Sequence, residues 1–365
     1  MAESNLGDAR VVMSSVSKHF QIIDLDPYST AAPFLDSAIQ AADDGALLCI
    51  TSTDGRSLNG LQHDTGYAWY GLMPMNTAFS KEFGVRALMT TLISTASRYA
   101  RSIEPLLCLA INFYVRIFVR ITDKKQPSKI TAGTTSLCFY SPSSCSFWLQ
   151  PMGLIKAKNT SKTIVPASLE LPNDSSHDPL TGGSLKIGGP VYTGPLFDHS
   201  FIDSVMAEIR NNRYLKTEDR VRAVLNTAKA EIDAPFYYDF SQLCGIVAAS
   251  CPSRAIVVGA LEKMGYQVSI THCERGNFKT TAPPEALWDI VRAWYFAEGK
   301  TMPTEDGVKK ALLSAPYSHE VCLDRDVEIV KRLKEEKRIC KFYENPTKDF
   351  GPKAAASSKK KVNKE

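Results

Sequence analysis

The chain of 365 residues is 44% apolar and 22% charged, which is typical of a globular protein with a sizeable buried core. Its best candidate for a membrane span, residues 105–119, is interrupted by Arg116 and alternates in polarity as a strand does, so no transmembrane helix is expected. The nine cysteines are odd in number and scattered, and the first seven residues are polar, unlike a secretory signal. We therefore expect reduced thiols and a location in the nucleus or the cytoplasm.

The formal net charge of +4 is concentrated at one end of the chain. Residues 346–365 hold six lysines against two acidic residues, so this tail carries the entire excess. A flexible basic tail favours binding to a polyanion through the release of counterions. A solvated, disordered end or a nuclear-import signal explains the same composition equally well, and both interpretations stay open.

The first element expected along the chain is a buried strand that ends in an acidic turn. Ile22 and Ile23 are β-branched and suit a strand, and Pro27 stops it because proline has no N–H and a fixed φ. Asp26 and Tyr28 flank the proline at the carboxyl end of that strand. Because ligands of open α/β sheets bind at this edge, the turn is the first candidate site.

The side chains of this turn suit the recognition of an amino group on a nucleobase. The Asp26 carboxylate and the Pro27 carbonyl are two acceptors that together can hold both protons of an exocyclic NH2. Tyr28 offers a flat face on which the base can stack. Asp-Pro-Tyr is also a common ordinary turn, so these residues alone leave a binding site and a plain surface turn both open.

The next elements follow from hydrophobic spacing and turn residues. We expect a helix over 32–43 that Gly45 ends, a strand over 47–50, a loop over 55–76, a helix over 78–102, and strands over 106–111 and 113–121. Glu82 and Arg86 are four residues apart on the long helix and can pair. The loop holds Tyr67, Trp69 and Tyr70, for which stacking on a base is open and packing over the sheet is the use we favour.

The second half of the chain is expected to be irregular at first and then mainly helical. Residues 122–196 are rich in Ser, Pro, Thr and Gly and predict an irregular insert. Further on, two helices followed by a hairpin over 266–281 resemble a winged helix. Its hairpin holds His272, Arg275 and Lys279, which can touch phosphate. Such modules also make purely protein contacts, so this use remains open too.

Several long segments resemble the tRNA (guanine-26-N2)-dimethyltransferase family, in order and over nearly the whole chain. The matching segments are Asp24-Leu-Asp-Pro-Tyr28, Ala32 to Gln40, Gly45 to Asp54, Tyr70-Gly71, Glu82 with Arg86, Phe113 to Arg120, Ala286 to Ile290, Asn345-Pro346 and Phe350-Gly-Pro352. Such a series is far more specific than one turn. The resemblance implies S-adenosyl-L-methionine as cofactor and tRNA as partner, and it indicates no obligatory protein partner.

The resemblance also implies roles for individual residues. Tyr28 would stack on a guanine that has left the helix, while Asp26 and the Pro27 carbonyl hold its amine, so these three are the predicted catalytic residues. Gly7-Asp8-Ala9 resembles the segment that contacts the adenine of the cofactor. Asp8 would accept from the adenine amino group, and the backbone of Ala9 would pair with the ring. A surface loop is the alternative for that segment.

The sequence departs from the family pattern in two places. No strand with a Gly-rich turn precedes Asp8, so the resemblance implies a sheet without its first three strands, which contain most of the cofactor site. The family often has two Cys pairs in the insert that look like a zinc site. Here only Cys145 matches a member of those pairs, and His177 and Asp178 stand where the second pair is expected. We therefore expect no metal.

We predict an α/β fold: a class I methyltransferase (Rossmann-like) sheet that lacks its first strands, followed by a C-terminal α+β winged-helix-like domain. The expected domains are an incomplete methyltransferase domain over 1–196, a tRNA-binding domain over 197–345 and a basic disordered tail over 346–365. The implied function is methylation, once or twice, of the N2 amine of guanine 26 in tRNA. The alternatives are a non-catalytic tRNA-binding remnant of the family and an amino-methyltransferase acting on DNA or another RNA.

Overall fold

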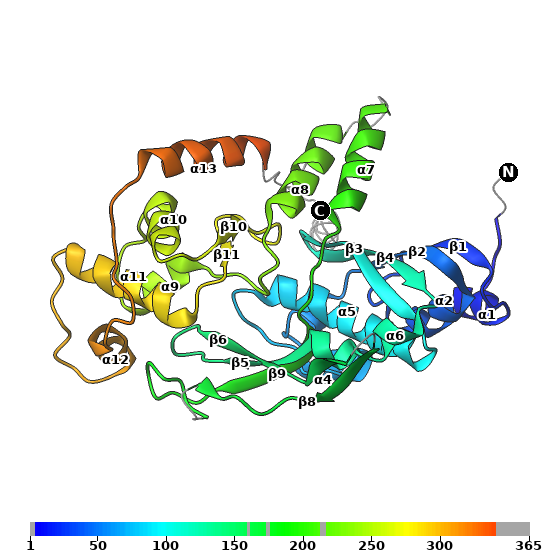
Figure 1. Cartoon of the computed structure of the whole chain (residues 1–365), viewed down its shortest axis with the longest axis horizontal. Coiled ribbons are helices and arrows are strands. Elements are labelled where there is room, and N and C mark those ends of the chain that lie inside the picture. Colours follow the sequence, from blue (N-terminus) through cyan, green and yellow to red (C-terminus); the bar gives the residue numbers. More distant parts are fainter. Residues whose placement is uncertain (1–3, 159–160, 173–175, 212–216, 341–365) are drawn as a thin grey trace, which may run out of the picture.

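The computed structural model describes residues 4–158, 161–172, 176–211 and 217–340, and the basic tail predicted over 346–365 lies outside them. The first part of the chain is built on a four-stranded sheet with the order β1-β2-β4-β3 (Figure 1). Its strands are β1 (Phe20–Leu25), β2 (Ala42–Ser52), β3 (Ser102–Ile111) and β4 (Tyr114–Thr122). β1 and β2 are parallel, whereas β4 runs antiparallel to both of its neighbours. Among the described strands β1 pairs only with β2, so its other edge is open.

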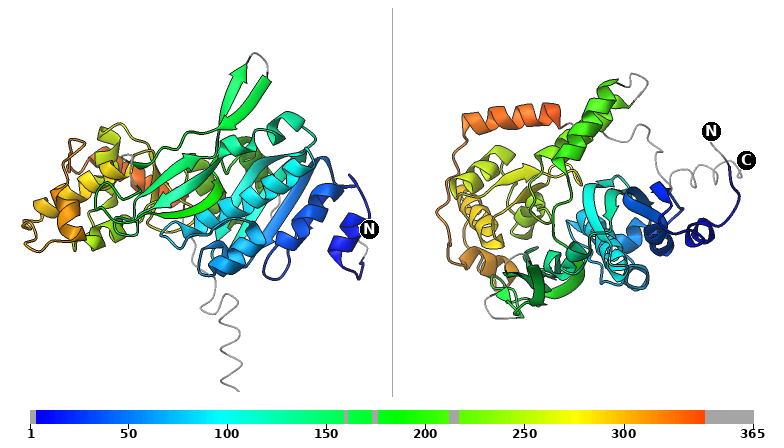
Figure 2. Two further views of the ribbon diagram at one scale, coloured as in Figure 1. Left: turned by 90° about the horizontal axis from the view of Figure 1, so that it is seen from below. Right: turned by 45° about the vertical axis from the view of Figure 1, so that its right-hand side comes forward.

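The sheet forms because its strands place β-branched residues on a buried face. β4 shows the predicted alternation: Val115, Ile117 and Val119 are buried, while Arg116 and Phe118 point to the other face. Helices α2 (Leu35–Ala41) and α5 (Ser80–Arg98) lie beside the sheet (Figure 2). They bury apolar side chains in the same core as the strands. The long helix and the strand pair β3–β4 therefore lie where the spacing predicts them.

Two of the expected boundaries around the sheet are wrong. The helix predicted over 32–43 consists of a 3-10 turn, η1 (Ala32–Phe34), and α2, and it ends at Ala41. Gly45 lies inside β2 at φ +80°, where the pairing register with β1 shifts, and so it serves the strand and not a helix end. The loop predicted over 55–76 contains α3 (Gly55–Leu58) and α4 (His63–Tyr70).

The segment 122–196 is more regular than its composition predicts. After the short turns α6 (Lys125–Ser128) and η2 (Thr131–Thr134), β5 (Thr135–Tyr140) lies between β6 (Phe147–Pro151) and β9 (Lys186–Tyr192). β7 (Gly153–Lys158) and β8 (Ser161–Pro166) form a hairpin that projects from the body (Figure 2). Gly188 lies in β9. A larger residue does not fit there, because a Cβ would lie 2.1 Å from Met75 Cγ. Some glycines of this segment therefore mark close approach and not a loop.

The C-terminal part has the predicted order of helices, hairpin and helices. Helices α7 (His199–Asn211) and α8 (Glu218–Ala230) form an antiparallel pair (Figure 1). The elements that follow are α9 (Phe240–Ile246), α10 (Arg254–Lys263), β10 (Val268–Ile270), β11 (Phe278–Thr280), α11 (Pro284–Ala297), the unpredicted α12 (Val308–Ser314) and α13 (Val327–Ile339). None of the helices in the described part of the chain combines the length and apolar character needed to span a bilayer.

Two hydrophobic cores divide the molecule at a different place from the predicted domain boundary. α7 and α8 bury Ile202, Ile209 and Leu225 in the first core, together with the sheet and α5. The second core begins at Tyr238 and is formed by the helices that surround the β10–β11 hairpin. The boundary predicted at 196/197 therefore lies within the first packing unit.

Candidate functional site

The Asp26-Pro27-Tyr28 turn directly follows β1, at the edge where the parallel strands β1 and β2 both end. Asp26 is exposed, Pro27 is half-buried, and Tyr28 is 103% exposed, so its ring packs against nothing in the described chain. Large aromatic side chains are usually at least partly buried. An aromatic ring held clear of the protein beside a carboxylate is available to stack on a ligand.

The turn is held in place by backbone bonds to the end of β2. Ser29 adopts φ +71°, a left-handed conformation that a serine occupies only where its surroundings require it. The Ser29 N–H donates to Thr53 Oγ1 at 3.1 Å, and the Thr53 N–H donates to the Ser29 carbonyl at 2.8 Å. The residue after Tyr28 is thereby fixed on both sides, which sets the direction in which the ring leaves the sheet.

A buried polar cluster lies under this turn and fixes the residues after it. The Tyr70 hydroxyl donates to Asp54 Oδ2 and the Ser52 hydroxyl donates to Asp54 Oδ1, both at 2.7 Å. The only hydroxyl proton of Tyr70 is used in the bond to Asp54, so the Thr30 hydroxyl donates to the Tyr70 oxygen, at 2.8 Å. The Ala31 N–H donates to Ser52 Oγ at 3.1 Å. Through Thr30 and Ala31, the cluster thus holds the segment that follows the turn.

The sequence did not single out Asp54, Ser52 or Thr30, and for Tyr70 it favoured packing over the sheet and left stacking on a base open. Burial raises the pKa of Asp54, although hydrogen bonds from Ser52 and Tyr70 oppose the shift. The pKa of Tyr70 is also raised, first by burial and then by the Asp54 charge. The other two aromatic residues of this segment, Tyr67 and Trp69, are exposed. A Ser-Thr-Asp sequence at a strand end is the signal that points to such a cluster.

Arg116 lies on the predicted face of β4, but the sequence did not predict its contacts in this region. Its guanidinium donates to both carboxylate oxygens of Asp24, at 2.7 and 2.9 Å, and to Thr51 Oγ1 at 2.7 Å. It therefore ties β4 and β2 to β1 two residues before Asp26. Burial alone would lower the pKa of Arg116, but the bonds to Asp24 raise it. A permanent positive charge accordingly lies next to the turn.

The predicted adenine contact lies at the start of a short helix, α1 (Ala9–Ser14). Asp8 caps this helix by accepting from the Arg10 N–H at 2.9 Å, and it also forms an ion pair with the Arg10 guanidinium at 2.7 Å. These bonds lower the pKa of the Asp8 carboxyl group. Arg10 also lies 5.9 Å from the ring centroid of Phe34. Asp8 and Ala9 are thereby brought near the segment that follows the Asp26 turn.

Comparisons with known proteins identify the family to which the chain belongs. A family model described as N2,N2-dimethylguanosine tRNA methyltransferase matches residues 1–292. The chain belongs to this family. It is 34% identical over 358 residues to tRNA (guanine(26)-N(2))-dimethyltransferase 2 of Arabidopsis thaliana. The aligned region covers 97% of this chain and 60% of that protein. For the mitochondrial enzyme of that name from Saccharomyces cerevisiae the identity is 30%, with 97% and 67% covered.

A structural comparison supports the fold assignment. A solved structure of Trm1 from Pyrococcus horikoshii with S-adenosyl-L-methionine matches with a TM-score of 0.64 and 24% identity, over 78% of this chain and 69% of that one. The predicted α/β methyltransferase fold is confirmed by this match together with the family membership. The chain spans 60% of the length of each of two curated relatives from Arabidopsis thaliana.

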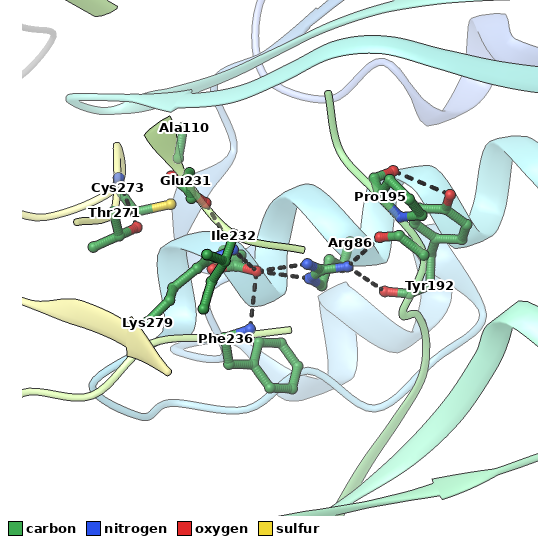
Figure 3. A network of polar contacts seen from close by, with 12 residues as sticks. Arg86, Ala110, Tyr192, Pro195, Glu231, Ile232, Phe236, Thr271, Cys273 and Lys279 are labelled. Atoms are coloured by element: carbon green, nitrogen blue, oxygen red, sulfur yellow. Dashed lines mark hydrogen bonds and ion pairs between the residues drawn. The ribbon is translucent and has the colours of Figure 1, made fainter. Parts of the chain in front are cut away.

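A buried ionic network joins the methyltransferase sheet to the C-terminal helices (Figure 3). Glu82 Oε1 on α5 accepts from Arg86 Nε at 2.8 Å, from Lys279 Nζ at 3.0 Å and from the Phe236 N–H at 2.9 Å. Lys279 also lies 2.7 Å from Glu231 Oε1. All four charged side chains are almost completely buried. The predicted pairing of Glu82 with Arg86 is confirmed, and it forms part of a larger cluster with no net charge.

Two of the three residues that the sequence suggested as phosphate contacts belong to the same buried network. His272 Nδ1 donates to Glu231 Oε2 at 2.8 Å, and His272 Nε2 accepts from the Ala110 N–H at 3.1 Å. Like Lys279, His272 is buried. The expectation that these two side chains touch phosphate is therefore wrong, because they pair with carboxylates inside the junction. Arg275, at the tip of the hairpin, is exposed.

Where many members of the family have two Cys pairs, this chain forms a cluster of hydroxyl groups around a carboxylate. The buried Asp178 accepts from Ser141 Oγ, from Thr181 Oγ1 at 2.9 Å and from the Leu180 N–H at 2.8 Å. Hydrogen bonds to Asp178 therefore join the two loops. Within the described ranges no three His, Cys, Asp or Glu side chains are grouped as metal ligands would be.

Proposed function

We propose that this chain takes part in the S-adenosyl-L-methionine-dependent methylation of the N2 amine of guanine at position 26 of tRNA. The observation that carries the proposal is the Asp26-Pro27-Tyr28 turn, in which a fully exposed ring stands beside an exposed carboxylate at the carboxyl edge of the sheet. Membership of the family and the names of the relatives support it. Reduced cysteines, all nine of which are free, support a location in the nucleus or the cytoplasm.

The chemistry requires that a poor nucleophile be held in one geometry. The lone pair of the guanine amine is delocalised into the ring, and inside a helix the amine is out of reach, so the base has to be flipped out. Tyr28 then stacks on the base, while Asp26 and the Pro27 carbonyl accept from the two amine protons and draw the nitrogen towards tetrahedral geometry. The contribution of the protein is positioning and electrostatic stabilisation.

Asp8 and Ala9 fit the adenine end of the cofactor. An ionised carboxylate has about four lone-pair sites, and in this structure four hydrogen bonds from Arg10 occupy them. The exposed Arg10 side chain therefore has to turn away before Asp8 can accept from the adenine amino group. The Ala9 N–H is in the first turn of α1, where backbone donors have no partner within the helix. When bound, S-adenosyl-L-methionine supplies an electrophilic methyl group. We assign no residue to its ribose and methionine ends.

A methyl-transfer assay on tRNA with Asp26 variants tests the proposed reaction. Asp26→Ala removes an acceptor for the amine and should lower the rate by several orders of magnitude, whereas Asp64→Asn, on the exposed start of α4, should leave it unchanged. Transfer by Asp26→Ala within about tenfold of the wild type would remove Asp26 from this role.

One observation favours a second candidate function, a tRNA-binding protein of this family without catalysis. Next to the proposed site, the outer edge of β1 is not paired with any strand of the described residues. Binding of S-adenosyl-L-methionine, measured by calorimetry on the purified chain, distinguishes the two functions. Tight binding supports the enzyme, while tRNA binding without cofactor binding supports the second candidate.

A further inference from the structure

A cleft of about 780 Å³ lies between α13, the tip of the β10–β11 hairpin and the start of α10. Its wall includes five basic side chains, which are Arg254, Arg275, Arg325, Lys334 and Lys337. Two acidic residues, Glu274 and Glu336, also line it. The cleft is therefore a basic hollow on the C-terminal helices, on elements other than those of the Asp26 turn.

The cleft exists because α13 covers the helix that a winged-helix protein would present to nucleic acid. Ile329 on α13 packs against Ala255 and Val258 of α10 in a small separate core. Two ion pairs join the same helices, Arg254 to Glu336 at 3.1 Å and Arg332 to Glu262 at 2.6 Å. α10 therefore cannot enter a groove of a duplex, and the hollow beside its first turn is what remains open.

The acidic residues of the cleft are already neutralised, whereas several of the cations are not. Glu274 pairs with Lys81, and Glu336 pairs with Arg254. By contrast, Arg325, Lys334 and Lys337 are exposed and form no ion pair with any described residue. Their charge is thus directed at solvent and at whatever enters the cleft.

These basic side chains come from α13, from the residues before it and from the hairpin tip. Lys334 and Lys337 lie on the same face of α13 as Val330, at helical intervals of four and seven residues. Arg325 precedes the helix, and the hairpin tip brings Arg275 to the opposite side. Inside the wall, the buried Nε of Arg254 has no hydrogen-bond partner, which leaves one more donor within the cleft.

We propose that this cleft binds the sugar–phosphate backbone of tRNA, an inference that rests on the proposed function and names a place for its substrate. Cations on two opposing walls match the phosphates of a nucleic-acid strand, and binding of this kind does not depend on sequence. The tail that follows α13 has an excess of lysines, so like charges exclude it as the occupant.

The test compares two triple variants of the full chain that lose the same charge. Arg325→Ala/Lys334→Ala/Lys337→Ala removes the three unpaired cations of the cleft. The control, Lys129→Ala/Lys156→Ala/Lys186→Ala, removes three exposed lysines from the part of the chain that contains β5 to β9. tRNA affinity is measured by filter binding between about 50 and 200 mM salt, with circular dichroism as the check on folding.

We expect the cleft variant to bind tRNA at least about tenfold more weakly, with a salt slope reduced by about two to three, because each lost phosphate contact lowers it by about 0.9. The control should stay within about twofold of the wild type. Arg325→Lys/Lys334→Arg/Lys337→Arg keeps the charge and should bind normally.

Three results would overturn the proposal: equal loss in the control variant, an unchanged slope in the cleft variant, or no binding of tRNA by the wild-type chain. A cleft variant that instead loses binding to an acidic protein or to anionic vesicles, but not to tRNA, also overturns it. None of these outcomes decides the proposed reaction, which stands or falls on cofactor binding and methyl transfer.

Discussion

The hydroxyl group of Tyr70 donates a 2.7 Å hydrogen bond to the buried carboxylate of Asp54, and through this bond α4 supports the turn that carries Asp26. Tyr70→Phe keeps the ring but removes the donor to Asp54 Oδ2 and the acceptor of the Thr30 hydroxyl proton. We expect a loss of about 1–3 kcal/mol in the free energy of unfolding. Urea denaturation measures it, with Tyr67→Phe, whose ring is 58% exposed, as the matched control. Equal stability of the two variants would contradict the role of this bond.

Asp54 should also make the stability of the protein depend on pH. Burial raises its pKa in the folded state above the ordinary value of 3.8. Such a group stabilises the fold fully below 3.8, and its contribution is lost as the pH rises through the folded pKa. The wild type should therefore lose stability relative to Asp54→Asn as the pH increases from below 3.8 towards neutrality. A stability difference that is independent of pH, measured by urea unfolding at a series of pH values, would show that the shift is absent.

Lys279 should be far more important for stability than the half-buried Lys81. Lys279→Met leaves the carboxylates of Glu82 and Glu231 buried without their shared cation, and breaking a buried pair costs about 3–5 kcal/mol. Lys81→Met removes an ion pair with Glu274 at the surface of the same junction, for which about 0–1 kcal/mol is expected. Chemical denaturation of both variants gives the comparison, and similar losses would mean that the network does not hold the two parts together.

Substitutions of Tyr28 test whether its ring stacks on the base, separately from any role of its hydroxyl group. Tyr28→Phe keeps the flat ring and should retain nearly all activity, whereas Tyr28→Ala should lower kcat/KM for tRNA by about 5- to 150-fold, which corresponds to the 1–3 kcal/mol of one stacked base. Because the side chain is fully exposed, neither change should alter the melting temperature. A large effect of Tyr28→Phe on methyl transfer would assign the role to the hydroxyl group instead of the ring.

The loops that carry Cys pairs in many relatives should be insensitive to chelators here. Addition of EDTA should leave the melting temperature unchanged, because Asp178 accepts hydrogen bonds from hydroxyl groups of both loops. Asp178→Ala leaves those buried hydroxyl groups without their acceptor and should destabilise the protein by about 1–3 kcal/mol. A drop in melting temperature with EDTA would reveal a metal that this cluster does not account for.

The sequence predicts well those features that depend on residues close together in the chain. The alternation of β4, the long helix α5 and the Glu82–Arg86 pair follow from periods of two and four residues. The strands of the segment 122–196 were missed because Ser, Gly and Pro are usual in loops, and only the approach of Met75 explains why a strand there needs Gly188.

The candidate site shows the same division. The Asp26-Pro27-Tyr28 turn is contiguous in sequence, so its chemistry could be proposed from the sequence alone. Its supports were not found, because Thr30, Ser52 and Tyr70 meet only after folding. His272 and Lys279 show the opposite error, since a charged residue in a hairpin suggests exposure, while their partners Glu231 and Glu82 come from distant segments. Partners far apart in the chain decide whether a charge is a ligand contact or a structural one.

The open edge of β1 has a practical consequence for anyone who purifies this chain. Ile22 lies on that strand with 66% of its surface exposed, and an unpaired strand edge is a template on which another chain can add. Only Asp24 and the break at Pro27 oppose such growth. We therefore expect edge-to-edge association in concentrated samples of the chain, with the exposed Ile22 on the strand that pairs.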